Sequence, residues 1–125
     1  MKWLLMVVLL TATPVLAQTE IECASYMLWK EARGESKRTA RAVLDVFENR
    51  QAAWGLTGCQ VLRQKGQYPY MRKRGVKKLD FEAVVRYTVV SEMFPVLTKN
   101  YLYFNHVKHP WGKATKRIGK LYFSQ

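Results

Sequence analysis

"IECASYMLWKEARGESKRTARAVLDVFENR" (residues 21–50) decides the fold, because it holds two helical patterns separated by a short polar stretch. The first pattern predicts a helix over residues 20–33, with apolar residues at intervals of three and four: Ile21, Ala24, Met27 and Leu28. Gly34 is a natural end for that helix, and Ser36 can cap a second helix over residues 37–50. A connection this short predicts that the two helices pack closely.

Glu31 occupies the next position on the apolar face of the first predicted helix. A carboxyl group there is partly desolvated, which is expected to raise its pKa. A carboxylic acid that stays protonated near neutral pH can act as a general acid, for example on a glycosidic oxygen. The alternative is that Glu31 forms an ion pair with a basic residue such as Arg33 or Arg50.

The rest of the chain adds a short helix over residues 59–64 and a longer one over residues 81–94, which Asp80 would cap and Pro95 would end. The longer helix is expected to face inward with five apolar residues: Phe81, Val84, Val85, Val89 and Met93. Two aromatic-rich segments, residues 101–107 and 119–125, each read as a strand of one hairpin-like pair lying on the helices. The predicted class is α+β, mostly helical with a small C-terminal sheet.

The N-terminus has the composition of a secretory signal peptide over residues 1–17. Lys2 precedes a short apolar run, and Val15 and Ala17 occupy the small-residue positions before a cleavage point. An uncleaved N-terminal anchor is the alternative. Residues 18–125 would then form one domain on the non-cytoplasmic side, periplasmic or secreted, with no membrane span left after cleavage.

Two cysteines, Cys23 and Cys59, are the whole complement of the chain. In an oxidising compartment they suggest one disulfide, whereas two buried free thiols are the alternative. Neither they nor His106 and His109 have the spacing of a zinc site, so no metal and no cofactor is expected.

The charge is strongly basic, with 21 Lys and Arg against 9 Asp and Glu and a net charge of +12. Such a chain is attracted to polyanions. Nucleic acid is one candidate, because basic and aromatic residues are interleaved over residues 68–78, although a solvated loop is the commoner fate of a basic run such as residues 71–78. The export signal argues against nucleic acid and favours cell-wall polymers or lipid headgroups.

Several segments resemble the cell-wall hydrolase family typified by spore-cortex-lytic enzymes. They are ECASYMLWKEARGES (residues 22–36), ARAVLDVFENR (40–50), GCQVLRQKGQYPY (58–70), and the closing HPW and IGKLYF (109–111 and 118–123). The resemblance covers about residues 22–123. It implies a lysozyme-like α+β domain that cleaves peptidoglycan between N-acetylmuramic acid and N-acetylglucosamine, as a lytic transglycosylase or a muramidase.

The resemblance also implies roles for individual residues. Glu31 would be the catalytic acid/base, with Glu35 orienting the site or binding sugar, or else capping the second helix. The other candidate substrate-binding residues are Gln67, Tyr68, Tyr103 and Asn105. Asn49 and Arg50 match an Asn-Arg pair, with either a structural role or a polar contact.

One segment departs from the family pattern. Where members carry a His-aromatic-His segment, this chain has LYFN (residues 102–105). The alternative to an enzyme is therefore a non-catalytic cationic module that binds the cell wall. The partner expected in either case is peptidoglycan, bound by a monomer.

Overall fold

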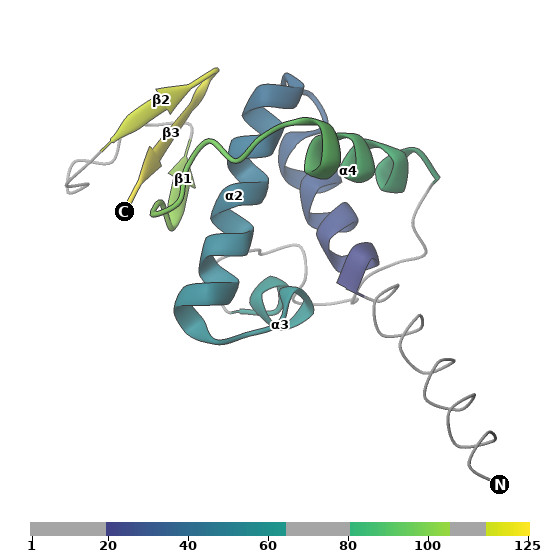
Figure 1. Cartoon of the computed structure of the whole chain (residues 1–125), viewed down its shortest axis with the longest axis horizontal. Helices are drawn as coiled ribbons and strands as arrows, with labels where there is room; N and C mark the ends of the chain where they lie inside the picture. The colour runs from purple at the N-terminus through teal and green to yellow at the C-terminus, as the bar shows by residue number, and fades with distance from the viewer. Residues whose placement is uncertain (1–19, 65–80, 106–114) are drawn as a thin grey trace, which may run out of the picture.

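The computed structural model describes residues 20–64, 81–105 and 115–125. It shows helices with a small antiparallel sheet (Figure 1), which confirms the α+β class. Several predicted features lie outside the described residues: the signal peptide, the cap Asp80, the basic run of residues 71–78, and the side chains of Gln67, Tyr68, His106, His109 and Trp111. Within the described ranges, no helix is long and apolar enough to cross a membrane.

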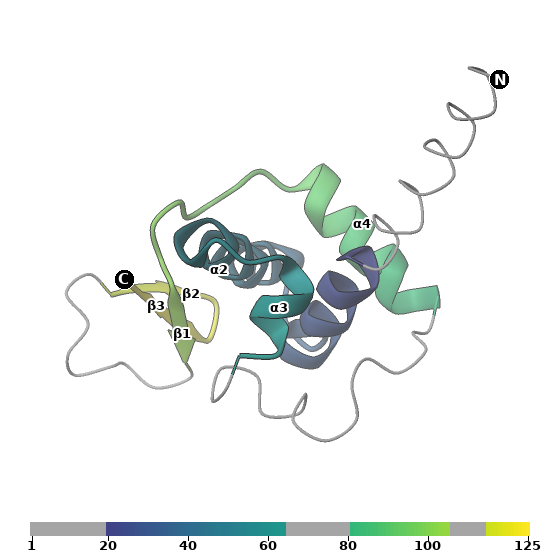
Figure 2. The ribbon, with the colours of Figure 1, turned by 90° about the horizontal axis from the view of Figure 1, so that it is seen from below.

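Helix α2 (Lys37–Trp54) is the centre of the molecule. Every residue from 39 to 47 is buried, so this helix is covered on all sides. Figures 1 and 2 show the sheet against one side of it and the other helices against the opposite side. The predicted cap is confirmed, since the Ser36 side chain accepts a hydrogen bond from the Thr39 amide at 3.2 Å. The helix continues one turn beyond the prediction and ends at Gly55, whose φ is 63°.

The N-terminal helix, described over residues 20–32, packs beside α2, and its buried face includes Ala24, Met27 and Leu28 as predicted. Ile21 is the exception, with 40 % of its surface exposed. The helix ends before Gly34, but Gly34 does not have the positive φ of a left-handed cap. The end of this helix must therefore be stabilised in another way.

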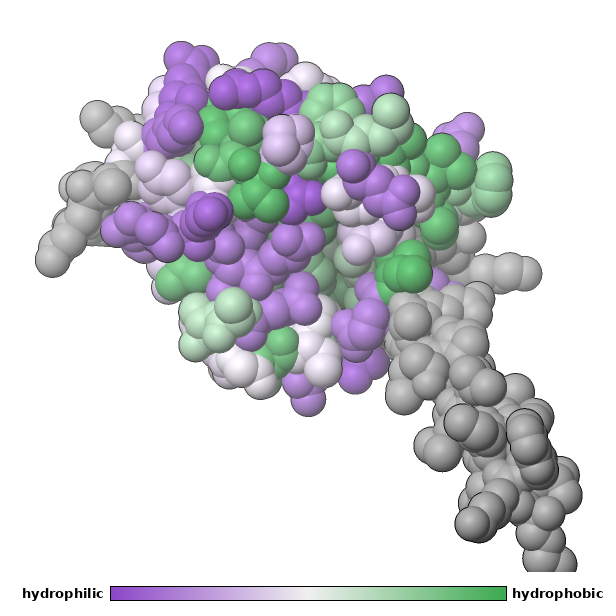
Figure 3. Space-filling view, viewed as in Figure 1, coloured by the Kyte–Doolittle hydropathy of each residue, from purple (hydrophilic) through white to green (hydrophobic). Residues whose placement is uncertain are grey.

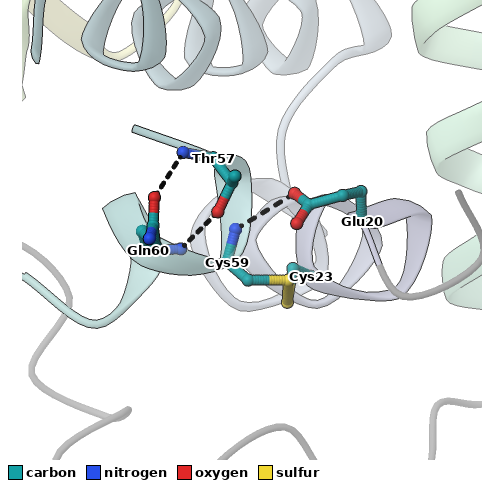
Figure 4. The surroundings of a disulfide bond; sticks show 5 residues. All are labelled: Glu20, Cys23, Thr57, Cys59 and Gln60. Atoms are coloured by element: carbon teal, nitrogen blue, oxygen red, sulfur yellow. Dashed lines mark hydrogen bonds between the residues drawn. A yellow bond between two sulfur atoms is a disulfide. The ribbon is translucent and has the colours of Figure 1, made fainter. Parts of the chain in front are cut away.

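The predicted disulfide is present between Cys23 and Cys59, with Cα atoms 5.3 Å apart. It joins the N-terminal helix to the short helix α3 (Gly58–Leu62), which begins one residue earlier than expected. The Glu20 carboxylate accepts a hydrogen bond of 3.2 Å from the Cys59 amide beside the bridge (Figure 4). Thr57 and Gln60 form a capping box at the start of α3, also drawn there.

Helix α4 (Phe81–Met93) has a different inward face from the one predicted. Ala83 and Val90 are buried, whereas Phe81, Val85 and Met93 are 83 %, 42 % and 74 % exposed. The prediction was wrong because the helix is apolar on most of its circumference, so the spacing of valines alone could not fix its rotation. Figure 3 shows hydrophobic side chains on the surface over α4.

The sheet has three strands in the order β1-β3-β2: β1 (Tyr103–Asn105), β2 (Lys116–Ile118) and β3 (Leu121–Ser124). Both pairings are antiparallel, with Phe104 opposite Phe123 and Ile118 opposite Leu121. The prediction of two strands was wrong in number, because β2 is formed by KRI and carries no β-type pattern. Gly119, with φ at 60°, makes the tight turn between β2 and β3, where a side chain would collide with the Thr39 hydroxyl.

Candidate active site

Glu31 lies in the last turn of the N-terminal helix and is partly exposed. Its helical neighbours Leu28 and Ala32 are almost fully buried, at 0 % and 1 % exposure. The helix thus presents a carboxyl group where its apolar face meets the surface. The partial burial predicted for Glu31 is thus confirmed, and its role as a general acid stays a prediction.

The backbone after Glu31 turns sharply toward α2. The Glu35 amide donates to the Ala32 carbonyl at 3.1 Å, and the N-cap Ser36 follows directly. One side chain from α4 also bonds this turn: Arg86 Nη2 donates to the carbonyls of Ala32 and Glu35, at 2.8 and 2.7 Å. The segment from Ala32 to Glu35 is therefore held at both ends by hydrogen bonds to its carbonyls.

Glu35 is partly exposed in this turn and does not belong to either helix. The reading of Glu35 as a cap of the second helix is wrong, because Ser36 takes that role. Arg33, also in the turn, is exposed and its guanidinium lies 5.9 Å from the Trp29 ring. The turn therefore carries two carboxylates and one guanidinium on an accessible surface.

The segment that leads into β1 is fixed to α2 by three polar residues. The Asp45 carboxylate accepts from the amides of Leu97 and Thr98, at 2.7 and 3.0 Å. One turn further along, Asn49 Nδ2 donates to the carbonyls of Thr98 and Tyr101, at 3.3 and 3.0 Å. Of the two alternatives for Asn49, these bonds favour the structural role.

Arg50, buried to 3 % exposure, completes this attachment, since its Nε donates to the Leu102 carbonyl at 2.7 Å. Its guanidinium also lies within 6 Å of three aromatic rings, at 5.7, 5.7 and 5.9 Å: Trp54, Tyr103 and Phe104. Such contacts stabilise a cation that is removed from water. We call these four side chains the arginine–aromatic cluster.

Two of the predicted substrate-binding residues lie on β1. Tyr103 is 43 % exposed, and Asn105, at the end of the strand, is also exposed. The strand places them on the same face, where Asn105 is opposite Tyr122 of β3. Arg117 of β2 is opposite Tyr122 in turn, with its guanidinium 5.5 Å from that ring. This face of the sheet thus combines amide, aromatic and cationic groups.

The structure places the predicted residues in two groups along α2. Glu31 and Glu35 adjoin its N-terminal end, near Ser36, whereas Tyr103 lies with Arg50 toward its C-terminal end. Fourteen residues of helix between Ser36 and Arg50 correspond to about 21 Å. The Gly119 turn of the sheet contacts Thr39, so the sheet also reaches the end of α2 near the Glu31 turn.

Three of the residues that build this arrangement were not predicted from the sequence. Asp45 had a signal, since it is a lone acid within the apolar run AVLDVF (residues 42–47). Trp54 lay beyond the predicted end of its helix. Arg86 had no local signal, because the carbonyls that it bonds are about fifty residues away in the chain.

A hollow of about 190 Å³ lies at the other end of the N-terminal helix from Glu31. Glu20, Phe47, Glu48 and Tyr87 contribute to its lining. Burial, the largest cause, raises the pKa of the Glu48 carboxyl; the Arg41 guanidinium opposes this rise and the Asp45 charge adds to it. Burial also raises the pKa of Tyr87, and the charge of Glu48 adds to that rise.

No group of three or more metal-ligating side chains occurs in the described part of the chain. The sequence matches no protein-family model, and neither curated proteins nor solved structures show significant similarity to it.

Proposed function

We propose that this protein is an exported enzyme that cleaves the glycan strand of peptidoglycan between N-acetylmuramic acid and N-acetylglucosamine, acting as a lytic transglycosylase. The observation that carries the proposal is the position of Glu31. Its carboxyl group stands at the boundary between a buried helix face and the surface, on a turn whose backbone is bonded on both sides. A general acid needs such a partly desolvated, well-oriented position.

Further features support the same reading. The disulfide is typical of an exported protein, and a net charge of +12 favours an anionic polymer as partner. The exposed Tyr103 ring offers a flat apolar face for a sugar, while Asn105 can hydrogen-bond an acetamido group. The resemblance of residues 22–36 to a family of cell-wall hydrolases points to the same substrate.

The proposed reaction needs one carboxyl group. Glu31 gives its proton to the glycosidic oxygen as the bond to C1 of the muramoyl residue breaks, which releases N-acetylglucosamine with a free 4-hydroxyl. The resulting Glu31 carboxylate then takes the proton of the muramoyl 6-hydroxyl, whose oxygen bonds to C1. The product is a 1,6-anhydro sugar, no water is consumed, and Glu31 returns to its protonated form.

The test is a digest of purified peptidoglycan, read by mass spectrometry of the released muropeptides. Wild-type protein should release products one water lighter than those of hydrolysis, and Glu31→Gln should release none. Glu22→Gln is the matched control, because Glu22 is an exposed glutamate on the same helix. Hydrolytic products lost in Glu31→Gln would instead identify a muramidase. No release by the wild type, with binding to sedimented cell walls retained, would leave the non-catalytic wall-binding module.

A further inference from the structure

We infer that Arg86 is the positioning residue of this active site, which fixes the turn carrying Glu31 and Glu35 in its working geometry. The inference rests on the proposed function for its catalytic consequence. Its structural part, that one side chain from α4 holds this turn, can be tested without any substrate.

Arg86 forms hydrogen bonds to both ends of the turn. Its Nη2 atom donates to the carbonyl of Ala32, the residue directly after Glu31, and to the carbonyl of Glu35, at 2.8 and 2.7 Å. One nitrogen therefore spans the interval between the two candidate carboxylates. Hydrogen bonds from a charged donor are about twice as strong as neutral ones, so this bridge is well suited to fix a backbone.

The start of the turn is also held by the buried Ala32, whose carbonyl accepts from the Glu35 amide at 3.1 Å, but its middle is not packed. Arg33 and Gly34, which lie between Ala32 and Glu35, are exposed. A Cβ atom added to Gly34 would meet nothing within 4 Å, so packing does not hold this residue. Gly34 also lacks the left-handed conformation that commonly closes a helix. Among the described side chains, Arg86 is thus the one that ties both ends of this turn to another helix.

Arg86 itself is well anchored for this role. It lies on the inner face of α4, three residues after the buried Ala83 and four before the buried Val90. Its Nε is buried and has no hydrogen-bond partner among the described residues. The two carbonyls of the turn are therefore what this guanidinium binds within the described structure, and loss of the side chain would release the turn from α4.

The experiment uses protein expressed from the full-length sequence, with three variants. Arg86→Met keeps length and removes the donors, Arg86→Lys keeps a charged donor, and Arg38→Met removes the same charge from an exposed site on α2. The readouts are hydrogen–deuterium exchange of peptides covering residues 28–36, and kcat and KM for peptidoglycan digestion.

In Arg86→Met we expect exchange in residues 31–36 to rise at least about tenfold and kcat to fall by a similar factor, with KM within about twofold of wild type. Arg86→Lys should recover most of both, and Arg38→Met should keep wild-type exchange and kcat. If Arg86→Met does not fold, the same comparison is made with Arg86→Lys, in which exchange of residues 31–36 should be faster and kcat lower than in wild type by about twofold.

Two outcomes would overturn the inference: wild-type exchange in Arg86→Met (or in Arg86→Lys, where Arg86→Met does not fold), or faster exchange with an unchanged kcat. An inactive wild-type protein would refute the proposed function instead, and in that case exchange alone decides whether Arg86 holds the turn.

Discussion

The carboxylate of Asp45, buried in the middle of α2, accepts a hydrogen bond of 2.7 Å from the backbone amide of Leu97, fifty-two residues further along the chain. The same carboxylate accepts from Thr98 and, at 2.8 Å, from the guanidinium of Arg41. Asp45 is 1 % exposed and Arg41 is 3 % exposed. A buried pair of this kind links the central helix to the segment that leads into the sheet.

Replacing Asp45 by Asn is therefore expected to destabilise the protein by about 2–4 kcal/mol, because it removes the buried carboxylate charge beside Arg41 and leaves only the half-exposed Glu48 as its anionic partner. The free energy of unfolding in urea measures this. Glu22→Gln, at an exposed position, should change it by less than about 0.5 kcal/mol. An Asp45→Asn protein as stable as the control would show that the pair does not hold the segment in place.

The disulfide gives a second prediction for stability. Cys23 and Cys59 are 36 residues apart, and closing a loop of that length stabilises a fold by about 4 kcal/mol in the chain-entropy model. The double variant Cys23→Ser, Cys59→Ser should lose about this much. Wild-type protein unfolded in the presence of a reductant should lose the same amount, and an insensitive wild type would mean that the bridge is absent in solution.

Local signals in the sequence predicted the helices well. Ser36 is the N-cap of α2 as predicted, and it acts on Thr39 three residues away, whereas the C-cap Gly55 lies beyond the predicted end of that helix. The apolar spacing of the N-terminal helix also identified its buried face, because that helix has a clearly polar side. Features of this kind are set by interactions within short stretches of the chain, so the local sequence is enough to predict them.

Long-range features were not predictable in the same way. The inward face of α4 carries Arg86, which bonds Ala32 and Glu35, and nothing near Arg86 in the sequence encodes those partners. Strand β2 forms because Ile118 pairs with Leu121 beside Gly119, although its own residues are mostly charged. The site was predicted in part for the same reason: Glu31 has a local signal, whereas the residues that position it do not.

Glu48 predicts a specific dependence of stability on pH. Its pKa is raised above the ordinary value of 4.5, so the folded protein holds this proton more tightly than the unfolded chain does. The resulting stabilisation is fully present below pH 4.5 and is lost as the pH rises through the raised pKa. Since 45 % of the side chain is exposed, the effect should stay below about 1 kcal/mol.

The measurement compares urea unfolding of wild type and Glu48→Gln between about pH 4 and about pH 7. In the wild type, Arg41 Nη2 donates a hydrogen bond of 3.1 Å to the Glu48 carboxylate. A glutamine at this position can still accept that bond, but it does not titrate. Wild type should lose stability relative to the variant as the pH rises. A difference that is constant over this range, or that grows in the opposite sense, would contradict the assignment.

Substitution of Tyr103 tests whether the surface of the sheet is part of a glycan-binding site, as the proposed function requires. Its ring is 43 % exposed and contacts the Arg50 guanidinium on one side. Tyr103→Ala should weaken binding to sedimented cell walls by about threefold to tenfold, as expected for loss of one aromatic contact. Tyr103→Phe keeps the ring and should bind within about twofold of wild type. Equal loss in both variants would implicate the hydroxyl rather than the ring.

Substitution by alanine is expected to change the stability of the protein in opposite directions at two glycines. Gly34 has no positive φ and open space around it, so Gly34→Ala should stabilise the protein by about 0.4–1 kcal/mol through the unfolded chain. Gly119 has a φ of 60° and lies against the Thr39 hydroxyl, so Gly119→Ala should destabilise by about 1–3 kcal/mol. Urea unfolding of the two variants measures both changes. If Gly119→Ala were as stable as Gly34→Ala, the turn between β2 and β3 could not be packed against the first turn of α2, and the sheet would not be fixed at the end of α2 where the Glu31 turn lies.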